Sequence, residues 1–119
     1  MTPDEVRLVI NGWLENQSQL VLVAQLWGFS VALRCRVAFL NAEWTVGLLT
    51  SDAGRIGVEL SEPGTEFKYA EPREFPELVA SSGLSAAQRV ASSITILFPP
   101  RESSDGEDRE VVSLIELID

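Results

Sequence analysis

The fold is decided by residues 20–60, which have the sequence LVLVAQLWGFSVALRCRVAFLNAEWTVGLLTSDAGRIGVEL. Runs of valine, leucine and aromatic residues are separated there by short polar breaks at residues 41–43 and 51–54. Apolar runs of this length, bounded by turn residues, are typical of strands that fold back on one another. We therefore expect an antiparallel meander over about residues 20–70.

The first strand, about residues 20–29, has apolar residues on both of its faces. One face carries Leu20, Leu22, Ala24 and Leu26, and the other carries Val21, Val23, Trp27 and Phe29. A strand without a polar face is normally covered on both sides. An N-terminal helix is expected to supply one cover, and the other comes either from the rest of this chain or from a second copy of it.

The next strand, about residues 31–40, alternates more clearly and should have one solvent-exposed face. Its apolar face carries Val31, Leu33, Cys35, Val37 and Phe39, and its polar face carries Arg34 and Arg36. Further strands are expected over residues 44–49, 55–60 and 65–70. Pro63 and Gly64 occupy the central positions of a type II turn, so the strand after this turn is expected to pair with the strand before it.

Residues 3–15 are predicted to form an N-terminal helix. Thr2 can cap it, Pro3 suits the first helical position, and Glu5 completes a capping box. Apolar residues recur at spacings of three and four, which gathers them into one stripe that can pack on the sheet. The stripe consists of Val6, Val9, Ile10, Trp13 and Leu14.

The second half of the chain has a weaker pattern. Residues 71–93 are expected to be irregular, apart from a short helix over residues 85–92 that begins with a capping-box pattern. Residues 94–118 are expected to form a hairpin of two strands around a mobile loop at residues 101–110. The predicted fold is a single domain, residues 1–119, that is mainly β (α+β): the N-terminal helix packs on a strongly bent antiparallel sheet or small barrel of about six or seven strands.

The charge and composition of the chain limit the kinds of partner that it is expected to bind. With 9 basic and 18 acidic residues the net charge is -9, so nucleic acid is an unfavourable ligand. No apolar run reaches the ~20 residues needed to cross a bilayer, and we expect no membrane partner. No signal-peptide pattern opens the sequence, and the single cysteine forms no internal disulfide. These features favour a cytoplasmic location.

The sequence contains few residue patterns that are typical of catalytic sites. The chain contains no histidine, which removes the commonest general base and most zinc and iron sites. Cys35 belongs to an apolar strand face and is expected to be a buried, unreactive thiol. The acidic residues around Asp108 lack the ligand spacing of a calcium loop. We therefore expect no enzymatic activity, no cofactor and no bound metal.

Three arginines are candidates for ligand binding. Arg34, Arg36 and Arg55 gather on one face if their strands lie close together, and they could then bind an anionic ligand. The alternative is cross-strand salt bridging to Glu43, Glu59 or Glu66, which is routine on exposed sheet faces.

Aromatic residues are candidates for an interface. Trp27, Phe29 and Trp44 could contact a partner, with core positions as the alternative. Together with the strand that is apolar on both faces, they favour a non-enzymatic interaction module that self-associates or binds a protein partner. This is the preferred function, and a homo-oligomer is the expected state.

The central strands resemble those of Sm-like proteins. The residues that carry the resemblance are strand 36–40, the turn after it, and a second strand ending in Val46-Gly47-Leu48-Leu49. In that family a glycine in the second strand allows strong bending and an aspartate soon follows; Gly47 and Asp52 correspond to them. The resemblance implies a small β-barrel and ring-like oligomers.

The segment Asp52-Ala53-Gly54-Arg55-Ile56-Gly57 resembles the Asp-x-Ser-x-x-Gly motif of PilZ domains, with Gly54 in place of the serine. These domains bind a cyclic dinucleotide with the help of a nearby arginine pair. Arg34 and Arg36 would correspond to that pair, although they are closer together in the sequence. The resemblance implies an alternative function as a sensor of a small anionic ligand, with Arg34, Arg36 and Arg55 as its binding residues.

Overall fold

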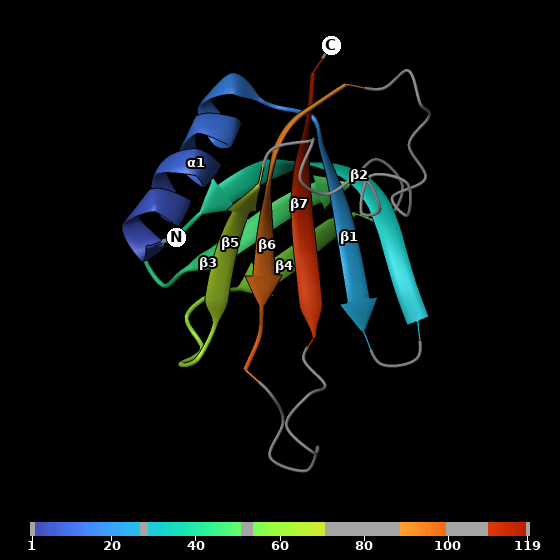
Figure 1. Cartoon of the computed structure of the whole chain (residues 1–119). Helices are drawn as coiled ribbons and strands as arrows, with labels where there is room; N and C mark the ends of the chain where they lie inside the picture. The colour runs from blue at the N-terminus through green and yellow to red at the C-terminus, as the bar shows by residue number, and fades with distance from the viewer. Residues whose placement is uncertain (1, 27–28, 51–53, 71–88, 100–109, 119) are drawn as a thin grey trace.

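The computed structural model describes residues 2–26, 29–50, 54–70, 89–99 and 110–118, and it contains one helix and seven strands in these ranges (Figure 1). They are α1 (Pro3–Asn16), β1 (Leu20–Leu26), β2 (Phe29–Leu40), β3 (Thr45–Thr50), β4 (Arg55–Glu59), β5 (Glu66–Ala70), β6 (Arg89–Leu97) and β7 (Val111–Ile118). The predicted mainly-β fold with an N-terminal helix is confirmed.

Helix α1 begins with the predicted capping box. The Glu5 backbone N–H donates to the Thr2 hydroxyl over 3.3 Å, and the Thr2 N–H donates to the Glu5 carboxylate over 3.1 Å. These bonds satisfy two amide groups that a helix start otherwise leaves without partners. Val6, Ile10 and Trp13 are buried against the sheet, so the apolar stripe packs as its spacing predicts.

The seven strands form one antiparallel sheet in the order β4-β3-β2-β1-β7-β6-β5. The sheet bends strongly but does not close, so β4 and β5 are its two edges. The prediction that β5 pairs with the strand before it is wrong, because β5 pairs with β6. The chain crosses from one edge of the sheet to the other between β4 and β5, and the meander therefore ends at β4.

The predicted reversal at residues 62–65 is confirmed. The Thr65 N–H donates to the Glu62 carbonyl over 3.2 Å, and Gly64 has a φ of 92°, which is the left-handed conformation that the third residue of a type II turn requires. A Cβ atom at Gly64 would lie 3.1 Å from the Pro99 Cβ atom. The turn therefore packs against the residues that follow β6.

Strand β1 lies at the centre of the sheet and is buried on both faces. Leu20, Leu22 and Ala24 face α1 and the main core. On the opposite face Val21 is only 2% exposed and Val23 only 4% exposed. This burial arises within a single chain, so a second copy is not needed to cover β1. The strand ends at Leu26, earlier than predicted; Trp27 and Gly28 lie outside the described residues, and Phe29 starts β2.

Strand β2 contains a bulge that the sequence pattern does not reveal. Val37 pairs with Leu48, but the next paired residue is Phe39, opposite Gly47. One additional residue, Ala38, reverses the alternation of side chains beyond it. Phe39 therefore leaves the predicted buried face and is 39% exposed. Its ring lies where a side chain at Gly47 would be, so Gly47 provides space for the ring.

The C-terminal hairpin is confirmed, since β6 and β7 pair antiparallel from Leu97↔Val111 to Arg89↔Ile118. Strand β6 begins at Arg89. The predicted helix is therefore wrong at residues 89–92, and the prediction of an irregular segment is wrong at residues 89–93. The β-branched and apolar residues Val90, Ile94 and Ile96 favour the strand. Residues 71–88 and the predicted mobile loop at residues 101–109 lie outside the described residues.

Candidate functional site

The register places the three predicted arginines on one face of the sheet, opposite to α1. Arg36 and Arg55 each pair with Leu49, one from either side, and Arg34 lies two residues from Arg36 on the same face. Arg36 and Arg55 are thus two strand spacings apart, about 10 Å. All three are exposed. Within the described part of the chain none of them forms an ion pair, so the predicted salt bridges to Glu43 and Glu59 are not made.

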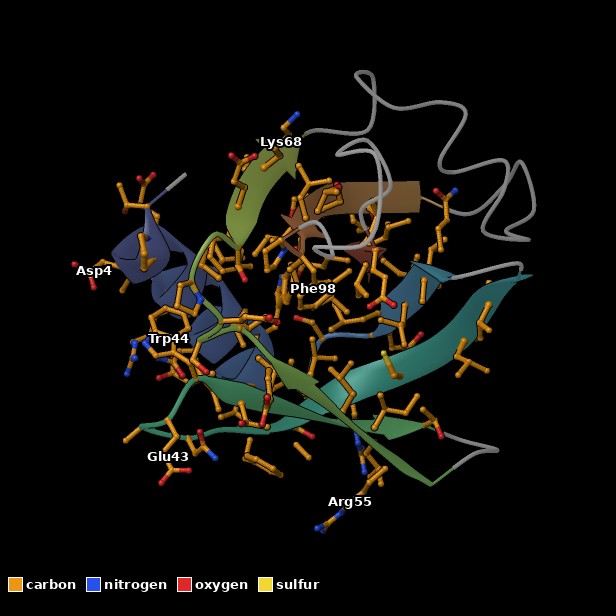
Figure 2. The ribbon with its side chains drawn as sticks, turned by 90° about the horizontal axis from the view of Figure 1, so that it is seen from below. Asp4, Glu43, Trp44, Arg55, Lys68 and Phe98 are labelled. Atoms are coloured by element: carbon orange, nitrogen blue, oxygen red, sulfur yellow. The ribbon has the colours of Figure 1, made fainter. Side chains whose placement is uncertain are left out.

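Two of these arginines line a hollow of about 450 Å³ beside the start of β1. Gln17, Gln19 and Thr50 also line it. Guanidinium and amide groups donate hydrogen bonds to anions, so this hollow can hold a small anionic group. Arg55 is not part of its lining, and Figure 2 shows the Arg55 side chain projecting away from the body of the protein.

Cys35 is buried on the inner face of β2, as predicted. Burial removes water from the thiolate and raises the pKa of the Cys35 thiol to about 11, although a hydrogen bond with the Leu22 backbone acts in the opposite direction. The thiol therefore stays protonated at neutral pH, where the thiolate would be the nucleophile. Any stability contributed by the protonated form would be lost only as the pH rises from about 9 through 11.

Trp44 occupies a constrained turn between β2 and β3. Its φ is 64°, an uncommon value for a bulky residue. The Asn41 carboxamide oxygen accepts hydrogen bonds from the backbone N–H groups of Glu43 (3.0 Å) and Thr45 (2.9 Å). The Trp44 ring is half-buried against the core, with the Arg7 guanidinium 4.3 Å from its centroid. Figure 2 shows the ring beside α1. As a proposed interface residue Trp44 thus has little free surface.

A groove between α1 and β5 was not predicted from the sequence. One hollow of about 510 Å³ is lined by Glu5, Leu8, Val9 and Tyr69, and a second of about 320 Å³ is lined by Pro3, Thr65, Glu66, Phe67 and Lys68. Together we call them the α1–β5 groove. Leu8 is 73% exposed and Tyr69 is 49% exposed. Leu8 lies off the apolar stripe of α1. This apolar residue outside the stripe was the one feature of the sequence that could have indicated the groove.

The α1–β5 groove adjoins the outer edge of β5. Among the described strands β5 pairs only with β6, so its other edge has no strand partner. Such an edge presents backbone N–H and C=O groups that can pair with another chain. The apolar surface and the hydrogen-bonding edge are thus next to each other.

The charges of the groove are mainly acidic. A hydrogen bond from the Thr2 backbone, together with one from its hydroxyl, holds the pKa of Glu5 below its usual value, so this exposed carboxylate is charged at neutral pH. Glu66 lines the other hollow, together with the basic Lys68. Figure 2 shows the Asp4 and Lys68 side chains projecting away from the core. With a chain charge of -9, the surroundings favour cationic ligands.

The described residues form neither a metal-binding group nor a membrane-spanning helix. In the described residues no three Cys, Asp or Glu side chains are grouped so that they could hold a metal ion. Helix α1, the helix in the described ranges, is too short to cross a membrane. No protein-family model, curated protein or solved structure matches the chain. The Sm-like and PilZ resemblances therefore rest on the quoted sequence motifs alone.

Proposed function

We propose that the protein is a non-enzymatic interaction module that binds an extended segment of a partner protein along β5. The observation that carries this proposal is the outer edge of β5, which pairs with no other described strand and lies next to the exposed Leu8 and Tyr69. The added segment would form an eighth strand between β5 and α1. Main-chain hydrogen bonds to the edge provide affinity in this binding mode, and side-chain pockets provide specificity.

The occupant is a partner protein and not a second copy of the chain. The strand that first suggested self-association, β1, is covered on both faces within one chain. Two copies would each carry a net charge of -9, which opposes their association. A partner segment with positive charge has no such penalty.

The chemistry of the segment follows from the groove. Alternate residues of an added strand point to opposite sides, so apolar residues on one side would contact Leu8, Val9 and Tyr69. Basic residues on the other side would be attracted by the acidic surface. The segment is therefore expected to alternate apolar and basic residues.

A peptide-binding measurement tests the proposal. An alternating valine–lysine octapeptide with a fluorescent label should bind the protein, whereas an alternating valine–glutamate octapeptide should not. Combining Leu8→Ala with Tyr69→Ala should weaken binding about tenfold or more, because the apolar contact area is lost. The matched control is Ile118→Ala, which removes a similarly exposed side chain (43%) at the end of β7 and should leave the affinity within about twofold.

Two results would overturn this function. One is equal binding of the basic and acidic peptides, which would remove the role of charge. The other is light scattering that shows a dimer at micromolar concentration which the Leu8→Ala and Tyr69→Ala changes dissociate. That result would identify a second copy as the occupant of the groove.

The hollow at Arg34 and Arg36 supports a second candidate function, the sensing of a small anionic ligand. Calorimetry with a cyclic dinucleotide is the test. If this function is correct, binding heat is expected and should disappear when Arg34→Ala and Arg36→Ala are combined, whereas Arg55→Ala, which lies outside the hollow, should change it little. Absence of heat with the unmodified protein would remove this candidate.

A further inference from the structure

Strand β4 is the second edge of the sheet, and apart from β3 it pairs with no described strand. Gly57, at its centre, is exposed, and a Cβ atom there would meet nothing closer than a Thr45 methyl group at 3.9 Å. The backbone of this edge is therefore accessible to another chain. Arg55 and Glu59, at the two ends of β4, are also exposed, and Figure 2 shows the Arg55 side chain projecting away from the body of the protein. Within the described part of the chain neither of them forms an ion pair.

The hydrogen bonds of the β3–β4 hairpin show which backbone groups of β4 point outward. The Thr50 N–H donates to the Gly54 carbonyl over 2.8 Å. At the other end of the hairpin, the Leu60 N–H donates to the Trp44 carbonyl over 2.8 Å. Successive residues of an antiparallel strand direct their backbone groups to opposite sides of the strand. Even-numbered residues of β4 therefore bond to β3, and the N–H and C=O groups of its odd-numbered residues point away from the sheet.

The sequence of β4, Arg-Ile-Gly-Val-Glu, is complementary to itself. When two copies of this strand run antiparallel about a two-fold axis at Gly57, Arg55 of each copy lies opposite Glu59 of the other. These paired residues are odd-numbered, so each pair can exchange both of its main-chain hydrogen bonds. Their side chains lie on the face opposite to α1, where a cross-strand pair of opposite charges stabilises a sheet. On the inner face Ile56 would contact Val58 of the other copy.

Other pairings between two copies lack this complementarity. A shift of two residues, which keeps the odd-numbered residues paired, places Arg55 or Glu59 opposite Gly57. In β5, two-fold pairing about the central residue places Lys68 opposite Lys68 of the second copy, and like charges directly opposite each other destabilise a sheet. Charge therefore favours self-pairing at β4 and opposes it at β5.

We propose that the protein forms a two-fold dimer in which β4 of one copy pairs antiparallel with β4 of a second copy. The net charge of -9 on each copy opposes association in general, so the dimer depends on the local pairing at β4. Two strands of five residues cover less surface than the ~800 Å² per partner of a standard interface. We therefore expect a weak dimer, with a Kd of roughly 10–100 μM. It uses the edge opposite to β5, so it does not compete with the proposed partner segment.

Exchanging the charges of β4 tests the dimer by sedimentation velocity of the whole protein, above and below the expected Kd. Glu59→Arg should weaken dimerisation about tenfold or more, because it places two guanidinium groups in each cross-strand pair, although it makes the net charge less negative. Arg55→Glu should weaken it similarly. An equal mixture of the two variants should form a heterodimer about as tightly as the unmodified protein, because every carboxylate then lies opposite a guanidinium. The double variant, which restores the net charge of -9, should dimerise as well.

Two controls separate this dimer from other modes of association. Glu15→Arg makes the same change of charge at an exposed position of α1 and should not weaken the dimer. Leu8→Ala combined with Tyr69→Ala should not weaken it either, since these residues line the α1–β5 groove. A monomer at all concentrations, or a mixture of the two single variants that associates no better than either alone, would overturn the proposal. Assemblies larger than a dimer would also overturn it, because two-fold pairing closes at two copies.

Discussion

Replacing Val23 by Asp is expected to lower the free energy of unfolding by about 4 kcal/mol or more, which is enough to unfold many domains of this size. Val23 is 4% exposed and is flanked in the sheet by Ala32 and Ser113. A carboxylate there would be buried with only Ala32 and Ser113 directly opposite, and the guanidinium of Arg34, which pairs with Val21, is exposed to solvent. A buried charge that lacks a direct partner is among the most destabilising changes. The measurement is unfolding in urea, monitored by circular dichroism.

The matched control for this substitution is Gln25→Asp. Gln25 lies on the same face of β1, two residues further along, and is exposed. Its replacement should change stability by only about 0.5 kcal/mol. If Val23→Asp were as mild as the control, the second face of β1 would not be buried within one chain. A second copy of the chain would then be the expected cover for this face of β1.

Shortening Ile10 to Ala is expected to cost about 2–5 kcal/mol of unfolding free energy. Ile10 is fully buried at the centre of the α1 stripe. The substitution removes apolar contacts and leaves a cavity that the surrounding strands can fill only in part. Thermal and urea unfolding should both report the loss.

Leu8→Ala is the control for the helix, because Leu8 is 73% exposed. Its effect on stability should stay within about 0.5 kcal/mol, although it contributes to peptide binding in our proposal. Comparable losses at positions 8 and 10 would mean that α1 does not pack by its predicted stripe.

The parts of the fold that could be predicted depend on local chemistry. Thr2, Pro3 and Glu5 determine the start of α1 through bonds within one turn. Gly64 determines the reversal after β4 because few other residues adopt its backbone conformation. Strict alternation was also sufficient to place Arg34 and Arg36 on one face, opposite to Cys35.

The predictions that are wrong concern features that depend on pairing between distant strands or on an irregular strand register. Which strand β5 pairs with depends on how the whole sheet bends, and no neighbouring residue encodes this. Ala38 introduces a bulge without a glycine to mark it, and Phe39 consequently faces solvent. The α1–β5 groove depends on the placement of two elements that are distant in sequence. Leu8 was visible as an apolar residue off the stripe, but its proximity to Tyr69 was not.

The central claim is that the outer edge of β5, which no other described strand covers, accepts an extended segment. Amide hydrogen exchange, measured with and without the valine–lysine octapeptide, tests it most directly. We predict slower exchange for amides of β5 (Glu66–Ala70) when the peptide is bound, with no change in β4 (Arg55–Glu59), the opposite edge of the sheet. Binding of the peptide with unchanged exchange in β5, or with protection of β4 instead, would contradict the claim.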